Sequence, residues 1–302
     1  MERVNEYINI EQEPPAIIES HRPPSNWPHE GRIEVKNVSL RYAPDLPDVL
    51  KEVTFSINPH EKVAIVGRTG AGKSTLSLAF FRIINLSGGL IIIDGIDISA
   101  IGLYDLRSRL TIIPQDPVLF TGTLRSNLDP LESCEDQELW EALKRVNFLD
   151  TLQGSDIGAT NDTIDPSNLT LDYPVSENGS NFSQGQRQLL CLARSLMQKN
   201  KIIFLDEATA SVDYETDRRI QKTIRSEFGD CTIVCIAHRL RTIIDYDKVL
   251  VLDKGRVIEY GSPLELIEKS SVGVFRSMCE ESGEFDELFE MAKGVNSFSA
   301  NF

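Results

Sequence analysis

The segment from Gly67 to Ser74 constrains this chain more than any other stretch. It reads Gly-Arg-Thr-Gly-Ala-Gly-Lys-Ser and fits the pattern G-x-x-x-x-G-K-S/T. A short apolar, β-branched run precedes it at Lys62–Val66, and a run with apolar residues at helical spacing follows at Thr75–Ile84. Strand, glycine loop and helix in this order form the setting in which the pattern binds nucleotide phosphates. The glycines let backbone N–H groups curl around an anion, and the helix N-terminus adds a favourable dipole.

The residues of this phosphate loop have separate expected roles. Lys73 would reach the β- and γ-phosphates of a nucleoside triphosphate, and Ser74 would supply a hydroxyl to Mg2+. A glycine turn in an unrelated α/β domain is the competing interpretation. The residues expected to bind the nucleotide here are Gly67, Arg68, Thr69, Gly70, Ala71, Gly72, Lys73, Ser74 and Thr75.

The composition excludes several classes of protein. The formal net charge is −15 and no run of clustered Lys and Arg occurs, so a nucleic-acid surface is not expected. No stretch approaches the ~20 consecutive apolar residues that a membrane span needs, and no apolar N-terminal segment suggests a secretory signal. The five cysteines are scattered, with no histidine at zinc spacing, which favours reduced cysteines in a cytosol-facing protein.

Strand-like and helix-like runs alternate after the phosphate loop, which predicts an α/β fold with a mainly parallel sheet and helices on both faces. Two strands before the loop, around Ile33–Leu40 and at Val49–Ile57, predict a small antiparallel sheet beside this core. A single amphipathic helix is predicted over Asp136–Leu152 because apolar residues fall at i, i+4 and i+7. The other predicted strands are Leu90–Asp94, Leu110–Ile113, Lys201–Asp206, Thr232–Ala237, Val249–Asp253 and Val257–Tyr260, and the other predicted helices are Gln184–Lys199 and Tyr214–Phe228.

A second chemical signal is the run Ile-Ile-Phe-Leu-Asp-Glu at Ile202–Glu207. A buried strand that ends in a carboxylate places that charge at the C-terminal edge of the sheet, beside the phosphate loop. Asp206 is expected to hold Mg2+, normally through water, and Glu207 to orient or deprotonate the attacking water. A solvated turn would also end a strand in two acids, but the pairing with the phosphate loop favours the catalytic interpretation.

The run Ser180–Gln188, which reads SNFSQGQRQ, resembles the signature sequence of ATP-binding cassette (ABC) proteins. Other elements of that family appear along the chain in the right order. Gln115 matches the Q-loop, Ser211–Asp213 the D-loop and His238 the switch histidine, while Tyr42 lies where the family places an aromatic ring that stacks on adenine. A lone histidine or strand-end tyrosine is usually structural, but together and collinear these elements identify the family.

The resemblance extends to one subfamily. Pro114–Pro130, Val175–Gln188 and Asp206–Asp213 look like the second, C-terminal nucleotide-binding domain of C-subfamily, multidrug-resistance-associated exporters. The tail from Asp245 to Lys293 looks most similar to fungal members, several of which are vacuolar.

Two features depart from the subfamily pattern. The signature has Phe182 and Gln184 where many ABC proteins have Leu and Gly, although Ser183, Gly185 and Gln186 are kept. An excursion over residues 154–179, rich in Asp, Asn, Ser, Thr, Gly and Pro, is also longer than expected.

The resemblance implies ATP hydrolysis at an interface shared by two domains. Ser183, Gly185 and Gln186 would cap the γ-phosphate of ATP bound to a partner, so one copy supplies half of each site. The implied cofactors are ATP and Mg2+, with Ser74, Gln115 and Asp206 as metal ligands. The residues that would act on ATP bound to this chain are Lys73, Ser74, Gln115, Asp206, Glu207 and His238.

The resemblance and the composition together predict a domain organisation. Residues 1–30, rich in Pro and Glu, are expected to be an extended linker, and residues 31–270 the nucleotide-binding domain. A helical subdomain that carries the signature is expected over about 115–198, with a loop insertion at 154–179. Residues 271–302 are expected to form a C-terminal helical extension that packs on its own domain.

Three functions compete. The first is the ATPase domain of an exporter, soluble itself and placed at the cytosolic face of a membrane, vacuolar in this subfamily, by partner transmembrane domains and a first nucleotide-binding domain. The second is a soluble ABC ATPase that acts on nucleic acid or ribosomes, but the sequence has no long coiled coil, second cassette or basic linker. The third is a non-transporting remnant or regulatory domain that binds ATP without its partner, although no catalytic position is degenerate.

Overall fold

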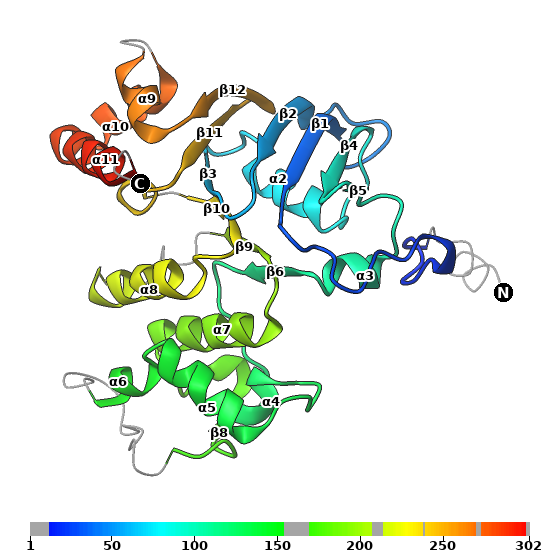
Figure 1. Ribbon diagram of the computed structural model, residues 1–302, viewed down its shortest axis with the longest axis vertical. Helices are drawn as coiled ribbons and strands as arrows, with labels where there is room; N and C mark the ends of the chain where they lie inside the picture. The colour runs from blue at the N-terminus through cyan, green and yellow to red at the C-terminus, as the bar shows by residue number, and fades with distance from the viewer. Residues whose placement is uncertain (1–11, 154–168, 207–213, 238, 270–272, 300–302) are drawn as a thin grey trace.

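A computed structural model describes residues 12–153, 169–206, 214–237, 239–269 and 273–299. Figure 1 shows two sheets side by side, with one group of helices below them and another beyond the far edge of the larger sheet. The predicted Glu207, His238 and D-loop, and most of the predicted insertion, lie outside the described residues.

The larger sheet has the strand order β12-β11-β3-β10-β9-β6. All neighbours pair in parallel except β12, which is antiparallel to β11. The predicted mainly parallel sheet is therefore confirmed. Its strands are β3 (Lys62–Val66), β6 (Leu110–Ile113), β9 (Ile202–Asp206), β10 (Thr232–Ile236), β11 (Lys248–Asp253) and β12 (Arg256–Gly261).

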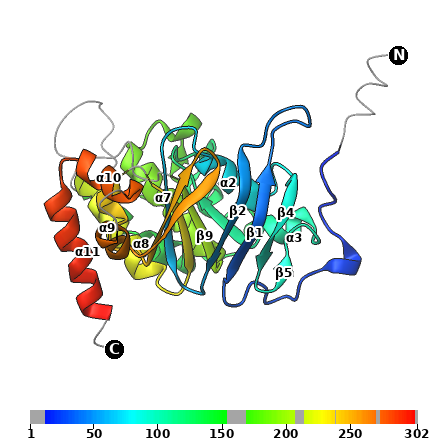
Figure 2. The ribbon, with the colours of Figure 1, turned by 90° about the horizontal axis from the view of Figure 1, so that it is seen from above.

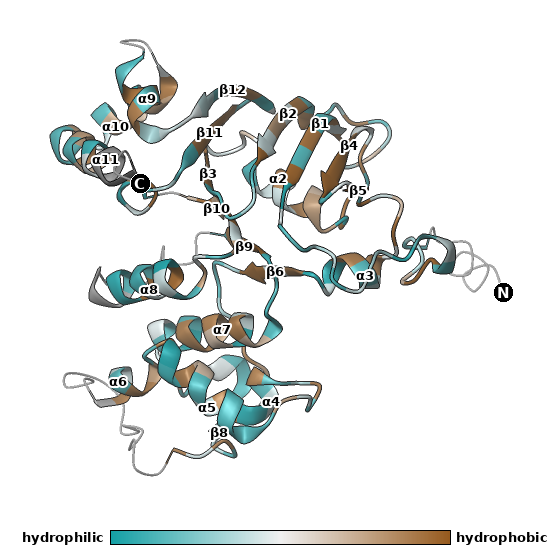
Figure 3. Ribbon diagram, viewed as in Figure 1, coloured by the Kyte–Doolittle hydropathy of each residue, from teal (hydrophilic) through white to brown (hydrophobic). Residues whose placement is uncertain are grey.

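The parallel strands are buried on both faces, which explains their continuous apolar sequences. In β3, Val63 and Ile65 face one core, whereas Ala64 and Val66 face the other. The first core lies between this sheet and the antiparallel sheet and includes α2 (Lys73–Phe80). The second lies between the parallel sheet and the other helices except α3 (Leu103–Arg107), whose Leu106 belongs to the first core. Figure 3 shows how apolar residues gather in the strands and in α7.

The smaller sheet is antiparallel, with the order β2-β1-β4-β5. It confirms the sheet predicted from the two strands that precede the phosphate loop. Figures 1 and 2 place it on the side of the domain opposite the C-terminal helices. Its strands are β1 (Ile33–Leu40), β2 (Leu50–Ile57), β4 (Gly88–Ile93) and β5 (Ile96–Asp97).

The helices below the parallel sheet in Figure 1 include α8 (Tyr214–Glu227) and a group made of α4 (Leu124–Leu128), α5 (Asp136–Arg145), α6 (Phe148–Gln153) and α7 (Gln184–Gln198). A two-stranded pair, β7 (Gly122–Thr123) and β8 (Pro174–Val175), and a 3-10 turn at Glu177–Gly179 complete this group.

The prediction of one helix over Asp136–Leu152 is wrong. The helix is interrupted at Asn147, between α5 and α6. The φ of Asn147 is 55°, in the left-handed region that Asn tolerates better than most residues. The break lets α5 and α6 both pack against α7 instead of running on as one rod. The apolar period continues across the break, so periodicity alone could not reveal it.

The C-terminal part of the chain forms α9 (Pro263–Glu268), α10 (Val274–Glu281) and α11 (Phe285–Ser299). In α11, Leu288 and Ala292 are buried, at 1% and 2% exposure, and belong to the second of the two cores described above. The predicted packing of this helix on its own domain is therefore confirmed. The helix α8 (Tyr214–Glu227), a short α3 (Leu103–Arg107) and 3-10 turns at Glu19–His21 and Leu240–Thr242 complete the elements.

Residues before the first strand also contribute to the core. Trp27 is only 2% exposed and donates its indole N–H to the Ile93 carbonyl at 2.8 Å. Sequence reasoning missed this packing because the surrounding Pro-rich segment has no apolar period. In the part of the chain that the structure describes, no helix is both long and apolar enough to cross a bilayer.

Candidate nucleotide-binding site

The predicted site residues gather at the carboxyl edge of the parallel sheet. Ile236 of β10 pairs with Ile65 of β3 on one side and with Asp206 of β9 on the other, so these residues form one row. The phosphate loop begins two residues beyond Ile65. Leu205 pairs with Ile113 at the end of β6, so Gln115 also lies just beyond the edge. Adjacent strands lie about 4.8 Å apart, so the carboxyl ends of β3, β9 and β6 lie along one edge of the sheet.

The glycines of the phosphate loop satisfy two different needs. Gly67, Gly70 and Gly72 have φ values of 153°, 81° and 106°, which L-residues with a side chain rarely adopt. A Cβ on Gly67 would lie 2.3 Å from the Leu252 carbonyl oxygen, so the loop also approaches the neighbouring strand closely. At Gly70 no atom lies within 4 Å of such a Cβ, and only the backbone conformation requires glycine.

Helix α2 begins at the loop with its backbone donors open. Its N-cap is Gly72, which makes no side-chain cap hydrogen bond to the first turn. The first N–H groups of a helix have no partner within the helix and carry the positive end of its dipole, so they can bind an anion. A cavity of about 310 Å3 lies in front of them, lined by Val49, Thr69, Gly70, Gly72, Lys73, Ser74 and Thr75.

The side chain of Lys73 is folded back onto the loop. It is 7% exposed, and its ammonium donates to the Gly67 carbonyl at 2.8 Å and to the Arg68 carbonyl at 3.3 Å. A phosphate in the cavity would replace these neutral carbonyls with charged oxygens, which form stronger hydrogen bonds with an ammonium group. The open helix end, the glycine loop and this ammonium together fit the triphosphate of a nucleotide.

Tyr42 lies over the start of α2. Its ring is 53% exposed, and its hydroxyl is 2.9 Å from the hydroxyl of Thr75, which is buried at 6% exposure. An exposed ring held beside the phosphate loop by its hydroxyl leaves a π face free for a planar group.

Three predicted polar residues complete the edge of the sheet that the structure describes. Ser74 lies in the first turn of α2, Asp206 is the last residue of β9, and Gln115 is exposed in the loop after β6. Hydroxyl, amide and carboxylate oxygens are the donor set that Mg2+ prefers. The described residues hold no cluster of three or more His, Cys, Asp or Glu that could bind a metal by themselves.

The predicted signature residues form the start of α7. Ser183 is the N-cap, and its hydroxyl accepts from the Gln186 N–H at 3.2 Å, while the Gln186 side chain accepts from the Ser183 N–H at 2.9 Å. This reciprocal pair is a capping box. Phe182, which departs from the family pattern, is 4% exposed and packs against Phe148 and Tyr173 at ring centroid distances of 6.1 and 5.9 Å.

A second cavity of about 500 Å3 lies between the end of α2, strand β6 and helix α7. Apolar side chains that are about half exposed line it, among them Ile83, Ile112 and Val118. Polar walls come from Arg107 and Arg194. Sequence reasoning did not identify this groove because its residues come from separate segments, although a Pro-bounded loop with exposed Val118 and Phe120 was a usable signal.

Comparison with known proteins agrees with this geometry. The family model described as ABC transporter matches residues 50–210. A solved structure described as a bacterial Atm1-family ABC exporter with ATP bound superposes with a TM-score of 0.74 and 32% identity, over 90% of this chain and 44% of that one. The parallel sheet, the antiparallel sheet and the helical group therefore make up the ABC ATPase fold predicted from the sequence.

Curated relatives match along almost the whole chain. ABC transporter 7 of Pyricularia oryzae is 52% identical over 97% of this chain. The ATP-dependent bile acid permease of Saccharomyces cerevisiae is 53% identical over 97%, and mouse ATP-binding cassette sub-family C member 2 is 52% identical over 94%. The chain spans only 18%, 18% and 17% of these three proteins.

Proposed function

Because the chain belongs to the ABC transporter family, we propose that it is the second, C-terminal nucleotide-binding domain of a fungal C-subfamily exporter, whose ATP hydrolysis powers export or vacuolar sequestration. The observation that carries this proposal is the phosphate loop, with its open helix end and the Lys73 ammonium beside a cavity of about 310 Å3. High identity to fungal and mammalian members over nearly the whole chain supports the subfamily.

The residues of the described site take complementary roles in this proposal. Backbone N–H groups of the loop and Lys73 bind the phosphates, and the exposed ring of Tyr42 stacks on adenine. Mg2+, held by Ser74, Gln115 and Asp206, would neutralise phosphate charge. In the sequence, Glu207 comes directly after the last residue of β9 and would orient the attacking water, and His238 comes shortly after the end of β10 and would act on the same ATP; both lie outside the described residues.

The second half of the site comes from a partner. Ser183, Gly185 and Gln186 at the start of α7 would cap the γ-phosphate of ATP held by a first nucleotide-binding domain. The partner's signature would in turn close over Lys73 of this chain. Closure excludes water, which strengthens the electrostatic stabilisation of the transferring phosphoryl group. Hydrolysis would therefore require both domains.

The groove beside β6 would receive the transmembrane partner. Its half-exposed Ile83, Ile112 and Val118 form an apolar floor of the kind that anchors protein interfaces, and Arg107 and Arg194 supply a polar rim. Pro114, which precedes Gln115, lines the groove, so a membrane segment bound there would lie close in the chain to a residue of the nucleotide site. In this proposal residues 31–270 form the nucleotide-binding domain, 115–198 its helical subdomain, and 271–302 a C-terminal extension.

The test is ATP turnover of Glu207→Gln, measured with a first nucleotide-binding domain present. Loss of a positioned general base should lower hydrolysis by roughly 10²–10⁴-fold. ATP binding should stay intact because the phosphate loop is unchanged. Glu141→Gln, an exposed carboxylate on α5, is the matched control. Unchanged turnover in Glu207→Gln would remove this residue from the mechanism, and absence of ATP binding by the unmodified chain would overturn the proposal as a whole.

A further inference from the structure

The segment Glu13–Trp27, which we call the N-terminal strap, is attached to α3 through the backbone. The Leu103 N–H donates to the Pro15 carbonyl at 3.1 Å, and the Tyr104 N–H donates to the Ala16 carbonyl at 2.8 Å. A Cβ on Gly102 would lie 2.3 Å from the Ala16 carbonyl oxygen, so only glycine allows this approach. The strap therefore follows a fixed course along α3.

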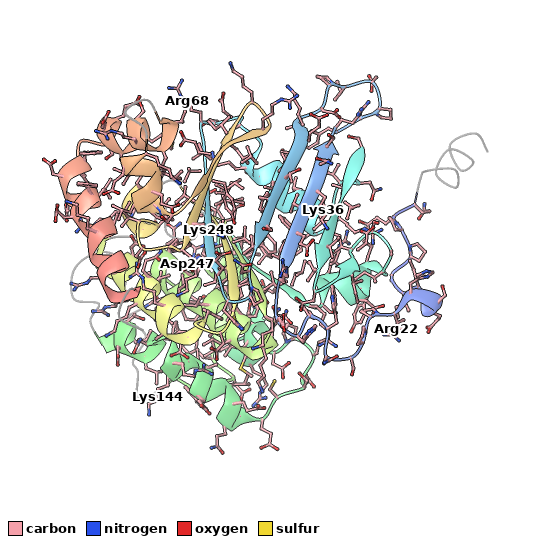
Figure 4. All side chains as sticks on the ribbon, turned by 45° about the horizontal axis from the view of Figure 1, so that its top comes forward. Arg22, Lys36, Arg68, Lys144, Asp247 and Lys248 are labelled. Atoms are coloured by element: carbon pink, nitrogen blue, oxygen red, sulfur yellow. The ribbon has the colours of Figure 1, made fainter. Side chains whose placement is uncertain are left out.

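Side chains hold the strap at further points. Arg22 pairs with the buried Asp105 at 3.1 Å, and Arg109 donates to the Ser25 carbonyl at 2.9 Å. At the C-terminal end of the strap, the indole of Trp27 is buried in the core and donates to the Ile93 carbonyl. Figure 4 shows Arg22 on the opposite side of the domain from Arg68 of the phosphate loop, so the strap itself does not reach the nucleotide site.

Arg107 joins this strap to α2. Its guanidinium donates to both carboxylate oxygens of Glu13, at 3.0 and 3.4 Å, and it also donates to the Phe81 carbonyl at 3.0 Å and the Arg82 carbonyl at 3.2 Å. The same cation lowers the pKa of Glu13, first through the hydrogen bond and then through its charge. One side chain therefore contacts the strap and the end of a helix.

The two carbonyls belong to the C-terminal cap of α2. The Ile83 N–H returns to the Leu78 carbonyl and the Arg82 N–H to the Ala79 carbonyl, and Arg82 adopts a left-handed φ of 49°. This is a Schellman cap, and the carbonyls that follow the helix have no helical partner. A guanidinium at this position satisfies them and interacts favourably with the negative end of the helix dipole.

The opposite end of α2 is the phosphate-binding end. The helix has only 8 residues, and Lys73 is the first of them. Binding of a phosphate must move the Lys73 ammonium away from the Gly67 and Arg68 carbonyls, so this end changes its contacts. A short helix packed in the core transmits a shift at one end to the other, because protein interiors are close-packed.

We propose that Arg107 is a positioning residue for the nucleotide site, fixing the C-terminal end of α2 against the N-terminal strap so that docking of the strap and binding of ATP strengthen each other. This inference rests on the ATP site proposed above. Coupling between two sites is reciprocal: whatever factor the docked strap adds to ATP affinity, ATP adds to docking of the strap.

The experiment measures both directions on the full chain. ATP affinity is determined by titration, and hydrogen exchange is followed at the Leu103 and Tyr104 amides, which donate to the strap. We expect ATP to slow exchange at both amides in the unmodified chain. Arg107→Ala should weaken ATP binding about 5- to 10-fold, the lower range of typical coupling, and abolish the ATP-dependent slowing.

Three variants separate coupling from a general loss of structure. Arg107→Lys keeps the charge but loses the planar fork, so it should restore part of both effects. Glu13→Gln weakens the contact with the strap and leaves the bonds to α2, so it should reduce both the affinity and the slowing, each by less than Arg107→Ala does. Arg109→Ala, whose hydrogen bond in the described chain goes to the strap, should keep ATP affinity within about two-fold, less than the coupling expected of Arg107.

The outcomes are distinguishable from failure of the proposed function. If the unmodified chain does not bind ATP, the nucleotide site itself is wrong. If it binds ATP but exchange at Leu103 and Tyr104 does not change, or if Arg107→Ala binds ATP as well as the unmodified chain, the positioning role is wrong. Should Arg107→Ala fail to fold, Glu13→Gln decides: ATP-dependent slowing equal to that of the unmodified chain overturns the proposal.

Discussion

Two helices begin at the proposed nucleotide interface, and their first turns are built in opposite ways. Helix α2 starts after Gly72 with no side chain on its backbone donors. Helix α7 starts after Ser183, whose hydroxyl and backbone N–H are both bonded to Gln186. We call the first turn of α2 the open turn, because it has no side-chain cap and can bind an anion. We call the first turn of α7 the closed turn, because its cap hydrogen bonds are made within the chain.

The difference teaches what each turn must do when ATP arrives. At α2 no side-chain cap has to be displaced, and the Lys73 ammonium exchanges two neutral carbonyl acceptors for charged phosphate oxygens, which bind it more strongly. At α7 the Ser183 oxygen accepts from the Gln186 N–H, while its O–H is a separate donor. The cap, of a kind worth about 1 kcal/mol, can therefore hold Ser183 in place in the single chain while the hydroxyl donates to the partner's γ-phosphate.

The largest effect should come from Lys73→Ala, which removes the cation at the open turn. Hydrogen bonds to charged groups contribute about 1.5–3 kcal/mol each, so ATP affinity should fall by about 100-fold or more. The measurement is titration of the single chain with ATP. Lys144→Ala, on the exposed side of α5, is the control and should bind normally. Affinity of Lys73→Ala equal to that of the unmodified chain would show that the open turn does not bind phosphate.

Next in size is the contrast between Gly67→Ala and Gly70→Ala within the same loop. At Gly67 the added Cβ would lie 2.3 Å from the Leu252 carbonyl, so the loop must shift, and we expect a loss of about 2 to 3 kcal/mol in the free energy of unfolding. At Gly70 the space is free and only the φ of 81° is strained, which predicts a loss of about 1 kcal/mol. Urea denaturation measures both, and equal losses would contradict the close approach.

The open turn could be predicted from sequence because its chemistry is local. The glycine pattern at Gly67–Ser74 and the acid that ends β9 each follow from adjacent residues, and the parallel register then brings them together. The closed turn at Ser183 was recognised only by resemblance. Its capping box, a Ser followed three residues later by a Gln, is nevertheless a local pattern that the sequence carries.

The features that the sequence did not predict are long-range. The indole of Trp27 bonds to the carbonyl of Ile93, and Glu13 bonds to Arg107, contacts that link residues far apart in the chain. No local period marks such pairs. The break at Asn147 was missed for the opposite reason, because the apolar period runs through it and only tertiary packing against α7 decides where the helix ends.

A smaller effect is expected at the closed turn. Ser183→Ala removes the cap and should lower the free energy of unfolding of the single chain by about 1 kcal/mol, whereas Ser183→Asp should keep it because Asp is an equally good cap. Both variants should bind ATP normally alone. In association with ATP, measured by sedimentation on the Glu207→Gln background, Ser183→Asp should fail because its carboxylate repels the partner's γ-phosphate. Normal ATP-dependent association of Ser183→Asp would exclude Ser183 from the shared interface.

The smallest effect is expected from removing the hydroxyl of Tyr42, which tests whether a side chain outside α2 contributes to ATP binding at its first turn. The hydroxyl of Tyr42 lies 2.9 Å from that of Thr75 in the first turns of α2, a contact between side chains that leaves the backbone donors open. Tyr42→Phe keeps the ring and removes this hydrogen bond, so the free energy of unfolding should fall by about 0.5–1 kcal/mol. ATP affinity should stay within about three-fold, since the stacking surface remains.

Thermal unfolding measures the free energy of unfolding, and ATP titration measures the affinity. The control is Tyr104→Phe, at an exposed tyrosine on α3. A loss of ATP affinity as large as that of Lys73→Ala would mean that the hydroxyl of Tyr42, and not the open backbone alone, prepares α2 for the nucleotide.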